Sequence, residues 1–321
     1  MLEALKFTKG AIARKDFAPV LTHFRIEGGR ITGYNGSMAL SSPIPLELTC
    51  SPKATDFIKA LDTCRGTISI HEMPNGSIVV QSGTFKASVK CSTDPFPALT
   101  LTGDRVELRE GILAPLKLLA PFISEDASRQ WSRGILFRGK SAFATDNLVI
   151  VETWLGYDFP LDLNIPKTAV TELLRIGLEP DYLVVSHTSC IFHFPGDRWL
   201  LTHTYSTEWP DVTRILDREC SPLDIPEGLF QGVRDVSPFS DDLGRIFLGS
   251  GKVSTVSLNH EDLGTVSEVP GLIVEDGCYH KDALASLEPV AKKIDLALYP
   301  KPCLFYGEAL RGAILGIRYA T

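Results

Sequence analysis

Several features that would assign this 321-residue sequence to a class of protein are missing from it. No apolar run approaches the roughly 18 residues that a membrane-spanning helix needs, so we expect no contact with a membrane. Lys6 and Lys9 lie where a secretory signal would need an apolar stretch, which favours a cytoplasmic protein. Acidic residues outnumber basic residues by 39 to 32, and the net charge of −7 argues against a uniformly basic nucleic-acid-binding protein. That charge is still compatible with a local basic surface.

Cysteine pairs at metal-site spacing are also missing. The seven cysteines are scattered, and none of them forms a CxxC motif. A disulfide framework or a structural zinc site would need closer or regular spacing. We therefore expect free thiols that are mostly small buried apolar residues, in a reducing compartment.

The sequence carries no arrangement that demands catalysis. His193 and His203 lie ten residues apart without an acidic or cysteine ligand at metal spacing. No serine lies in a nucleophile-elbow motif. The acidic pairs Glu125-Asp126 and Asp241-Asp242 are typical of solvated turns. The sequence thus predicts no metal, no cofactor and no enzymatic activity.

One motif does match a catalytic pattern. Residues Gly134–Ser141 satisfy GxxxxGK[ST], the phosphate-binding P-loop, in which Lys140 would contact the phosphates. A P-loop must be followed by a helix, whose N-terminal N–H groups bind the phosphates. Here the flanking residues look like strand on both sides. A hairpin turn is the favoured interpretation, and a P-loop NTPase is retained as the alternative.

Internal repetition is the main positive feature. Three different motifs recur in the same order at nearly one spacing, which indicates three copies of a repeat of about 110 residues. Phe24-Arg25 recurs at Phe137-Arg138, Lys53 recurs at Lys167 and Lys281, and Phe96-Pro97 recurs at Trp209-Pro210.

The predicted class is α+β, with three tandem domains at 1–103, 104–219 and 220–321. Each domain is expected to pack two helices on antiparallel sheets. The helices are predicted at 2–14, 52–64, 110–123, 166–176, 226–236 and 281–288, and strands include 78–80, 86–91, 182–185, 191–194 and 313–319. The predicted helices are less acidic than the rest of the chain, which would suit a surface that faces phosphate.

Several segments resemble the beta subunit of bacterial DNA polymerase III, the sliding clamp. They cover most of the first two repeats and are sparser in the third. The matching segments are 18–24, 82–99, Gly134–Phe137 with Ala144-Thr145-Asp146, 165–174 and 209–216.

This resemblance implies a half-ring of three clamp-like domains, which a head-to-tail homodimer closes around double-stranded DNA without reading its sequence. A DNA polymerase and a clamp loader would be its partners. The residues expected to face DNA are Lys6, Lys9, Arg14, Lys167 and Arg175. The expected dimer seam joins Phe85 and Val89 of one copy to Pro238 and Phe239 of the other.

The resemblance also implies an apolar cleft for a short peptide from the polymerase or the loader. Its expected residues are Thr145, Leu148, Val149, Ile150, Leu216, Leu315 and Ile317. Leu315 and Ile317 are expected to lie on one face of a terminal strand. Asn147, Leu148 and Val149 stand where the family usually has glycine, histidine and arginine, so a phage-encoded or divergent member would fit. A second alternative is a ring-shaped scaffold that does not act on DNA.

Overall fold

The computed structural model describes residues 1–14, 18–109, 111–205, 208–257, 264–274 and 276–319. Its contacts group the chain into two compact units. Unit 1 contains Met1–Ala114 and Thr168–Ser206, and unit 2 contains Pro115–Lys167 and Thr207–Thr321. The middle third of the chain is therefore shared between the units, and the three predicted domain boundaries stay a prediction.

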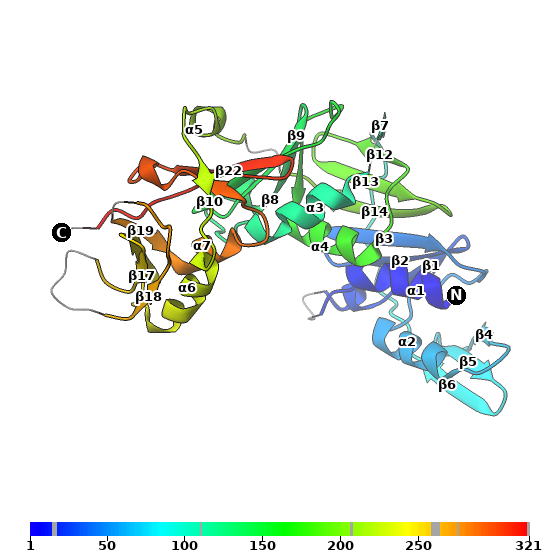
Figure 1. The fold of residues 1–321 in the computed structure, drawn as a ribbon. Coiled ribbons are helices and arrows are strands. Elements are labelled where there is room, and N and C mark those ends of the chain that lie inside the picture. Colours follow the sequence, from blue (N-terminus) through cyan, green and yellow to red (C-terminus); the bar gives the residue numbers. More distant parts are fainter. Residues whose placement is uncertain (15–17, 110, 206–207, 258–263, 275, 320–321) are drawn as a thin grey trace. The chain divides into compact units, whose positions relative to one another are not determined.

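The order of elements repeats three times along the chain (Figure 1). Each repeat has a helix, a three-stranded meander, a second helix and a second three-stranded meander. The first repeat contains α1 (Leu2–Thr8), β1 (Arg25–Glu27), β2 (Arg30–Tyr34), β3 (Met38–Pro43), α2 (Ala54–Thr63), β4 (Ser69–Glu72), β5 (Ile78–Ser82) and β6 (Phe85–Val89).

The other two repeats keep this order and each add two short strands. The second contains β7 (Asp104–Glu107), α3 (Leu113–Leu119), β8 (Gly134–Arg138), β9 (Ser141–Thr145), β10 (Val149–Trp154), β11 (Leu163–Pro166), α4 (Lys167–Ile176), β12 (Tyr182–Val185), β13 (Ser189–Phe194) and β14 (Arg198–His203). A short helix, α5 (Thr213–Leu216), follows. The third contains β15 (Leu223–Asp224), α6 (Leu229–Val236), β16 (Arg245–Gly249), β17 (Lys252–Ser254), β18 (Val266–Glu268), β19 (Gly277–His280), α7 (Lys281–Ser286), β20 (Lys293–Ile294), β21 (Cys303–Gly307) and β22 (Leu310–Ile314).

Every described strand pair is antiparallel, as the α+β prediction requires. In unit 1 a seven-stranded sheet runs β1-β2-β3-β14-β13-β12-β7, and a three-stranded sheet runs β4-β5-β6. In unit 2 an eight-stranded sheet runs β11-β8-β9-β10-β22-β21-β20-β15, and a four-stranded sheet runs β18-β17-β16-β19. Two of the four sheets thus join strands of successive repeats, through β3 with β14 and through β10 with β22.

The cores form because helices cover the inner faces of these sheets. In unit 1, Phe24 and Phe57 meet edge to face with ring centroids 6.5 Å apart, and both are fully buried. In unit 2, α6 packs against α7 and against β17 and β18, as Figure 1 shows. In the parts of the chain that are described, no helix has the length and apolarity to span a bilayer.

The predicted helices all exist, but most are shorter than expected. The helix at 2–14 becomes 3₁₀ at Lys9–Ala11, and the one at 110–123 begins at Leu113 and becomes 3₁₀ at Ala120–Phe122. Position 110 lies outside the described residues. A 3₁₀ turn accommodates Pro121, which has no N–H for an α-helical bond. The helix at 226–236 begins only at Leu229, after Gly228 with φ 88°.

Two further sequence interpretations have clear outcomes. The P-loop alternative is wrong, because β8 and β9 form a hairpin around Gly139 (φ 54°) and Lys140, and no helix follows. The predicted strand 313–319 is also wrong beyond Ile314, where the ladder with β21 ends.

Candidate partner-peptide groove and basic helix surface

A tight turn at the start of β10 presents Leu148 to solvent. The Asp146 carboxylate accepts hydrogen bonds from the backbone N–H groups of Leu148 (2.8 Å) and Val149 (2.7 Å). Asn147 takes a left-handed conformation with φ 77°, which asparagine tolerates better than most residues. The Thr145 hydroxyl donates to the Val149 carbonyl at 2.7 Å. The side chains of Thr145 and Asp146 therefore hold the turn, and the Leu148 side chain is left half-buried.

The chain beyond β22 brings a second leucine beside the first. The Leu315 N–H donates to the Leu148 carbonyl at 2.7 Å, and the Leu315 side chain is 41% exposed. Two residues before Leu315, Ala313 pairs with Ile150 in the ladder between β22 and β10. The start of β10, from the second repeat, and the chain that follows β22, from the third repeat, thus supply one apolar surface.

These residues line a groove of about 170 Å³, which we call the apolar groove. Five of the seven predicted cleft residues line it: Thr145, Leu148, Val149, Ile150 and Leu315. The sequence did not predict the rest of the lining, which comprises Arg129, Trp131, Asn147, Pro210, Val212, Ile215, Pro302 and Ala313. The repeated Trp209-Pro210 motif was the available signal for part of it.

The segment around Trp209 packs on the sheet and forms one wall of the apolar groove. Trp209 is buried, and its ring meets that of Trp131 at a centroid distance of 5.1 Å. Leu216, at the end of α5, lies in the same core cluster and is 1% exposed. Leu216 therefore supports the groove from the core and does not line it, so its predicted place in the cleft is wrong.

Ile317 is also misplaced by the prediction. Its N–H donates to the Cys278 carbonyl at 2.8 Å, and its carbonyl accepts from the Tyr299 hydroxyl at 2.7 Å. These bonds attach residue 317 to β19 and its surroundings, away from the groove lining. The physical reason is that the ladder between β22 and β21 ends at Ile314, so the alternation of a strand does not continue to residue 317.

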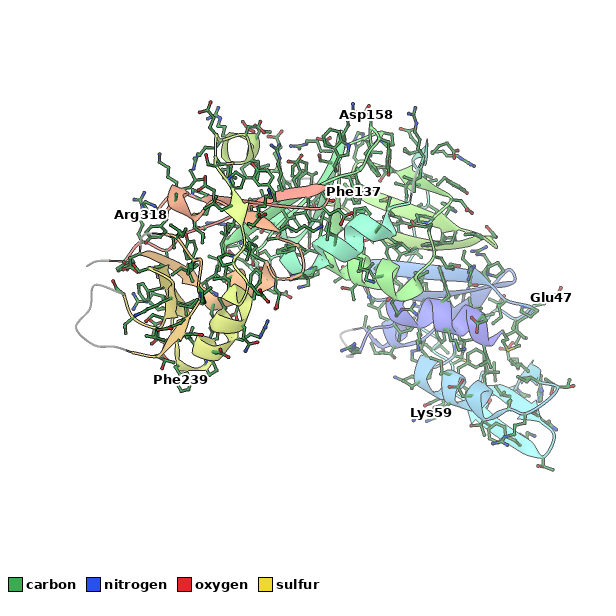
Figure 2. The ribbon with its side chains drawn as sticks, in the orientation of Figure 1. Glu47, Lys59, Phe137, Asp158, Phe239 and Arg318 are labelled. Carbon is green, nitrogen blue, oxygen red and sulfur yellow. The ribbon has the colours of Figure 1, made fainter. Side chains whose placement is uncertain are left out.

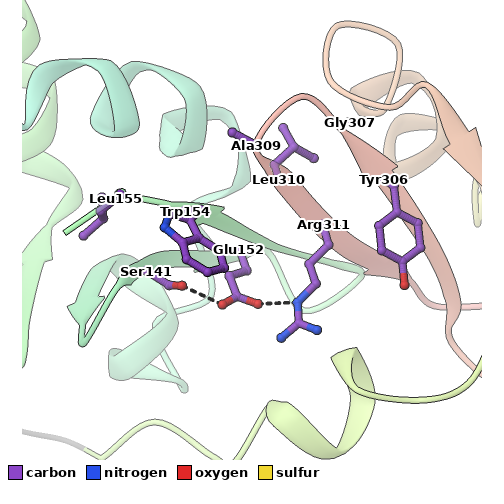
Figure 3. A pocket seen from close by; sticks show the side chains of 10 residues that line it. Ser141, Glu152, Trp154, Leu155, Tyr306, Gly307, Ala309, Leu310 and Arg311 are labelled. Carbon is purple, nitrogen blue, oxygen red and sulfur yellow. Dashed lines mark hydrogen bonds and ion pairs between the residues drawn. The ribbon is translucent and has the colours of Figure 1, made fainter. Parts of the chain in front are cut away.

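A second hollow lies over the same sheet at the other ends of β10 and β22 (Figure 3). Glu152 accepts hydrogen bonds from Ser141 and from Arg311, both at 2.6 Å, and Arg311 also bonds Asp217 at 2.8 Å. Trp154, at the rim, is 63% exposed. Because the charges here are paired with one another, this hollow of about 750 Å³ offers little unpaired charge to a ligand.

The basic side chains predicted to face DNA differ in their exposure and in their ion pairs. Lys6, Lys9 and Arg14 are exposed, although Lys6 pairs with Glu3 at 3.1 Å. Lys167 forms an ion pair with Glu125, and the hydrogen bond from Lys167 lowers the pKa of the Glu125 carboxyl. Exposed Lys59 on α2 and Lys117 on α3 were not predicted, and they extend the set of basic residues on helices.

Arg175 has a structural role inside unit 1. Its guanidinium donates to the carbonyls of Lys6 (2.9 Å) and Phe7 (2.8 Å), near the C-terminal end of α1. It also forms an ion pair with Glu172, which is buried. Gly10 lies so close to that carboxylate that a Cβ atom would come within 1.8 Å of it. Arg175 therefore ties α4 to α1, and its replacement would disturb folding as well as charge.

The predicted seam residues also divide by burial. Phe239, at the end of the 3₁₀ turn after α6, is 65% exposed, as its position in Figure 2 illustrates, and Pro238 is exposed. Phe85 is half-buried on β6. Val89 is 1% exposed and belongs to the core cluster of unit 1. Its side chain is thus not presented to a partner, which excludes Val89 from the predicted contact surface.

Nothing in the described residues suggests a metal centre, since no group of three or more His, Cys, Asp or Glu side chains could hold an ion there. The seven cysteines are all free thiols. What the geometry offers instead is an apolar groove, an exposed aromatic residue and a set of basic residues on helices.

This architecture is that of the sliding clamps, in which the same order of helices and antiparallel sheets repeats along the chain. In particular, the chain has the fold of the beta subunit of bacterial DNA polymerase III, which confirms the expected resemblance at the level of the fold. No family model and no curated protein matches the sequence.

The solved structures carry this conclusion. The beta subunit of Streptococcus pyogenes DNA polymerase superimposes with a TM-score of 0.81 at 19% identity, over 99% of this chain and 97% of that one. The Bacillus subtilis sliding clamp gives 0.80 at 15% identity, with the same coverage. The Helicobacter pylori beta clamp, solved with a DNA ligase peptide bound, gives 0.76 at 15% identity, again with that coverage.

Proposed function

We propose that this protein is a DNA sliding clamp, a processivity factor that encircles duplex DNA and tethers a replicative polymerase. The observation that supports it most is the match of 99% of the chain to bacterial polymerase beta subunits at TM-scores near 0.8. The role is mechanical and needs no catalytic residue. It would place the protein with a polymerase and a clamp loader in the bacterial cytoplasm, whether the gene is a host's or a phage's.

The internal repeat supports ring closure by a second copy. The last strand of the first meander of one repeat pairs with the last strand of the second meander of the next repeat. These pairs are β3 with β14 and β10 with β22. The strands left over in this pattern are β18, from the third repeat, and β6, from the first. Each is one of the two edge strands of its sheet in the described residues. An unpaired edge is a template for another strand, so β18 of one copy would pair with β6 of the next.

Closure of this kind is heterologous, and two copies joined at both seams would make a closed ring. Phe239 and Pro238 follow α6 in the third repeat, and Phe85 begins β6. An exposed Phe239 has a physical reason in this arrangement, since the partner's Phe85 region would cover it.

DNA would be held by the exposed basic residues Lys6, Lys9 and Arg14 and by the half-buried Lys167. Phosphate attraction of this kind is independent of base sequence and weakens with salt, which suits a protein that must slide. A closed ring then needs no tight binding, because topology prevents escape. Arg175 contributes charge from a position fixed by its bonds to α1.

The apolar groove is the proposed site for the polymerase and loader peptides. Its lining offers leucine, isoleucine, valine and proline side chains around the Thr145 turn, with Arg129 as a polar residue at the edge. Pockets of this chemistry bind peptides through aromatic or leucine anchors.

The assembly is tested by light scattering and electron microscopy on the purified chain. We expect twice the chain mass of 35.2 kDa and a ring-shaped particle. Phe239→Asp should give folded monomers, because burying a carboxylate at an apolar seam is unfavourable. Leu223→Asp is the matched control, since Leu223 is also exposed, at 60%, but belongs to β15 in the eight-stranded sheet and not to the sheet that contains β18. A wild-type monomer at micromolar concentration, or a dimer that survives Phe239→Asp, would refute the seam.

The DNA-facing residues are tested by triple replacement. Lys6→Glu, Lys9→Glu and Arg14→Glu together should weaken DNA retention at least about tenfold at moderate salt and reduce the salt dependence. The control replaces Lys292, Lys293 and Lys301 with glutamate, which changes the net charge equally at exposed sites elsewhere. Equal loss in both variants would show that total charge, and not the proposed surface, governs retention.

A further inference from the structure

Two cysteines that are 41 positions apart in the sequence meet in unit 1. Cys50 pairs with Ile26 of β1 through backbone hydrogen bonds of 2.8 and 3.0 Å. On its other side the same segment pairs with the chain that follows β6, where Pro52 faces Cys91. The Ser92 N–H donates to the Ser51 carbonyl at 2.8 Å, and the Lys53 N–H donates to the Lys90 carbonyl at 2.9 Å.

This register fixes the two thiols on one face. Side chains two apart on a strand share a face, so Cys50 lies diagonal to Cys91, which is opposite Pro52. The neighbouring Cys50 thiol lowers the pKa of Cys91, and the Cys91 thiol raises the pKa of Cys50. The register therefore places the two thiols side by side, and all seven cysteines are free.

The two thiols differ in access. Cys50 is 7% exposed and belongs to the core cluster of unit 1, whereas Cys91 packs at the edge of that cluster and is half-buried. The more acidic thiol is also the more accessible one. This is the arrangement that thiol–disulfide exchange needs, with one sulfur to attack first and a second sulfur in contact to complete the reaction.

We propose that Cys50 and Cys91 are a modification site that forms a reversible disulfide, with a small-molecule disulfide such as oxidised glutathione as the oxidant. The proposal stands independently of the proposed clamp function.

The reaction balances in two exchange steps. The Cys91 thiolate attacks one sulfur of oxidised glutathione, a mixed disulfide forms, and one glutathione leaves as its thiolate. Cys50 then loses its proton to solvent and attacks the Cys91 sulfur, which expels the second glutathione. Two protein thiols are oxidised, and one glutathione disulfide is reduced to two thiols.

The bond would constrain a large part of the first repeat. The chain between the two cysteines contains α2 and the strands β4, β5 and β6. A cross-link over a loop of this length restricts the unfolded chain and so stabilises the folded one. We expect the oxidised protein to melt about 5–10 °C higher than the reduced protein.

The test uses the full chain and oxidised glutathione as the probe. After oxidation, free thiols are blocked with N-ethylmaleimide and the protein is digested with trypsin without reduction. Mass spectrometry should find peptide 31–53 linked to peptide 91–105, and the count of thiols titrated in denaturant should fall from seven to five. Linkage of either peptide to a different cysteine, or glutathione adducts without this link, would overturn the proposal.

Variants separate the two steps. Cys50→Ser should stop at a glutathione adduct on Cys91, and Cys91→Ser should prevent both the link and the rise in melting temperature. Cys64→Ser is the matched control: Cys64 is a half-buried thiol of the same core, but its sulfur bonds the Ala60 carbonyl at 3.2 Å. It should oxidise as the wild type does. If Cys64→Ser loses the stabilisation and Cys91→Ser keeps it, the assignment is wrong.

Discussion

The turn before β3 in unit 1 and the turn before β10 in unit 2 have the same backbone conformation and differ in their side chains. Asn35 accepts from the N–H groups of Ser37 (3.1 Å) and Met38 (3.0 Å), just as Asp146 accepts from those of Leu148 and Val149. The residue between is in the left-handed region in both, at Gly36 (φ 95°) and Asn147.

The opposing strand is also equivalent. The His203 N–H donates to the Ser37 carbonyl at 3.5 Å, where the Leu315 N–H donates to the Leu148 carbonyl. In the sheet, the pair Ala39 with Leu201 corresponds to the pair Ile150 with Ala313. Ser37 and His203 are exposed polar residues at the positions that the two leucines occupy in unit 2.

The hollow over the sheet of unit 1 lies away from this turn, since neither Ser37 nor His203 lines it. The hollow of unit 1 measures about 800 Å³ and is lined by Arg25, Glu27, Arg30, Asp94, His193 and Asp197, among others. Its charges pair with one another, as in the ion pairs of Arg30 with Asp197 and of Arg25 with Glu27. The comparison teaches that the repeat supplies a common scaffold, and that a few side chains turn one copy of it into an apolar groove.

The largest effect is expected from Leu148→Lys. A lysine in the apolar groove would place a charge against an apolar peptide, so affinity for a polymerase-derived peptide should fall at least about thirtyfold. The half-buried position should leave the ring assembled. Ser37→Lys is the matched change in unit 1 and should leave affinity unchanged. Calorimetry on both variants decides, and a normal affinity of Leu148→Lys would remove the groove from the account.

Leu315→Ala should have a smaller effect. It removes the exposed leucine from the groove wall but retains the backbone bond to Leu148, so about a fivefold loss of peptide affinity is expected. His203→Ala is the corresponding change in unit 1. Fluorescence anisotropy with a labelled peptide measures both, and an equal loss in the two variants would contradict a difference between the units.

The turn itself should matter less to binding than to stability. Asp146→Ala removes two hydrogen bonds to backbone N–H groups and should lower the free energy of unfolding by about 1–2 kcal/mol. Asn35→Ala should cost a similar amount, since its turn has the same bonds. Peptide affinity should change in the first variant alone and by less than about threefold. Denaturant melts and peptide titrations give the two quantities separately, and a large binding change in Asn35→Ala would be unexpected.

The smallest effect tests the comparison in reverse. Ser37→Leu with His203→Leu would introduce the two leucines into the unit 1 turn and should create weak, millimolar binding of the same peptide there. Ala39 and the charged surroundings still differ from unit 2, so full affinity is not expected. Chemical-shift changes of residues near Ser37 would report the new site, and an affinity equal to that of the apolar groove would show that the two leucines alone define it.

The sequence predicted the fold because its repeat left visible marks. The lysines at 53, 167 and 281 lie immediately before or at the start of α2, α4 and α7, and the second aromatic-proline motif marks the segment that borders the apolar groove. Helix ends were less predictable. The first helix becomes 3₁₀ at Lys9, where Gly10 lies against the Glu172 carboxylate, and such a tertiary contact is not visible in a single sequence.

The candidate site was predicted in part, for physical reasons that differ between residues. Leu148, which is half-buried, and the exposed Leu315 are apolar residues at positions that the resemblance indicated. Ile317 failed because the ladder stops at Ile314, and alternation along a strand has no meaning beyond it. Arg175 appeared as one more basic residue on a helix, whereas its contacts with the backbone of α1 are tertiary and leave no mark in a single sequence.

The central claim is that the protein holds DNA by encircling it. The most direct measurement loads the chain onto a nicked circular plasmid with a bacterial clamp loader and follows the retained protein by gel filtration, before and after one restriction cut. The account predicts retention on the circle that resists moderate salt, and release once the plasmid is linear. Equal retention on circular and linear DNA, or none on either with an active loader, would contradict it.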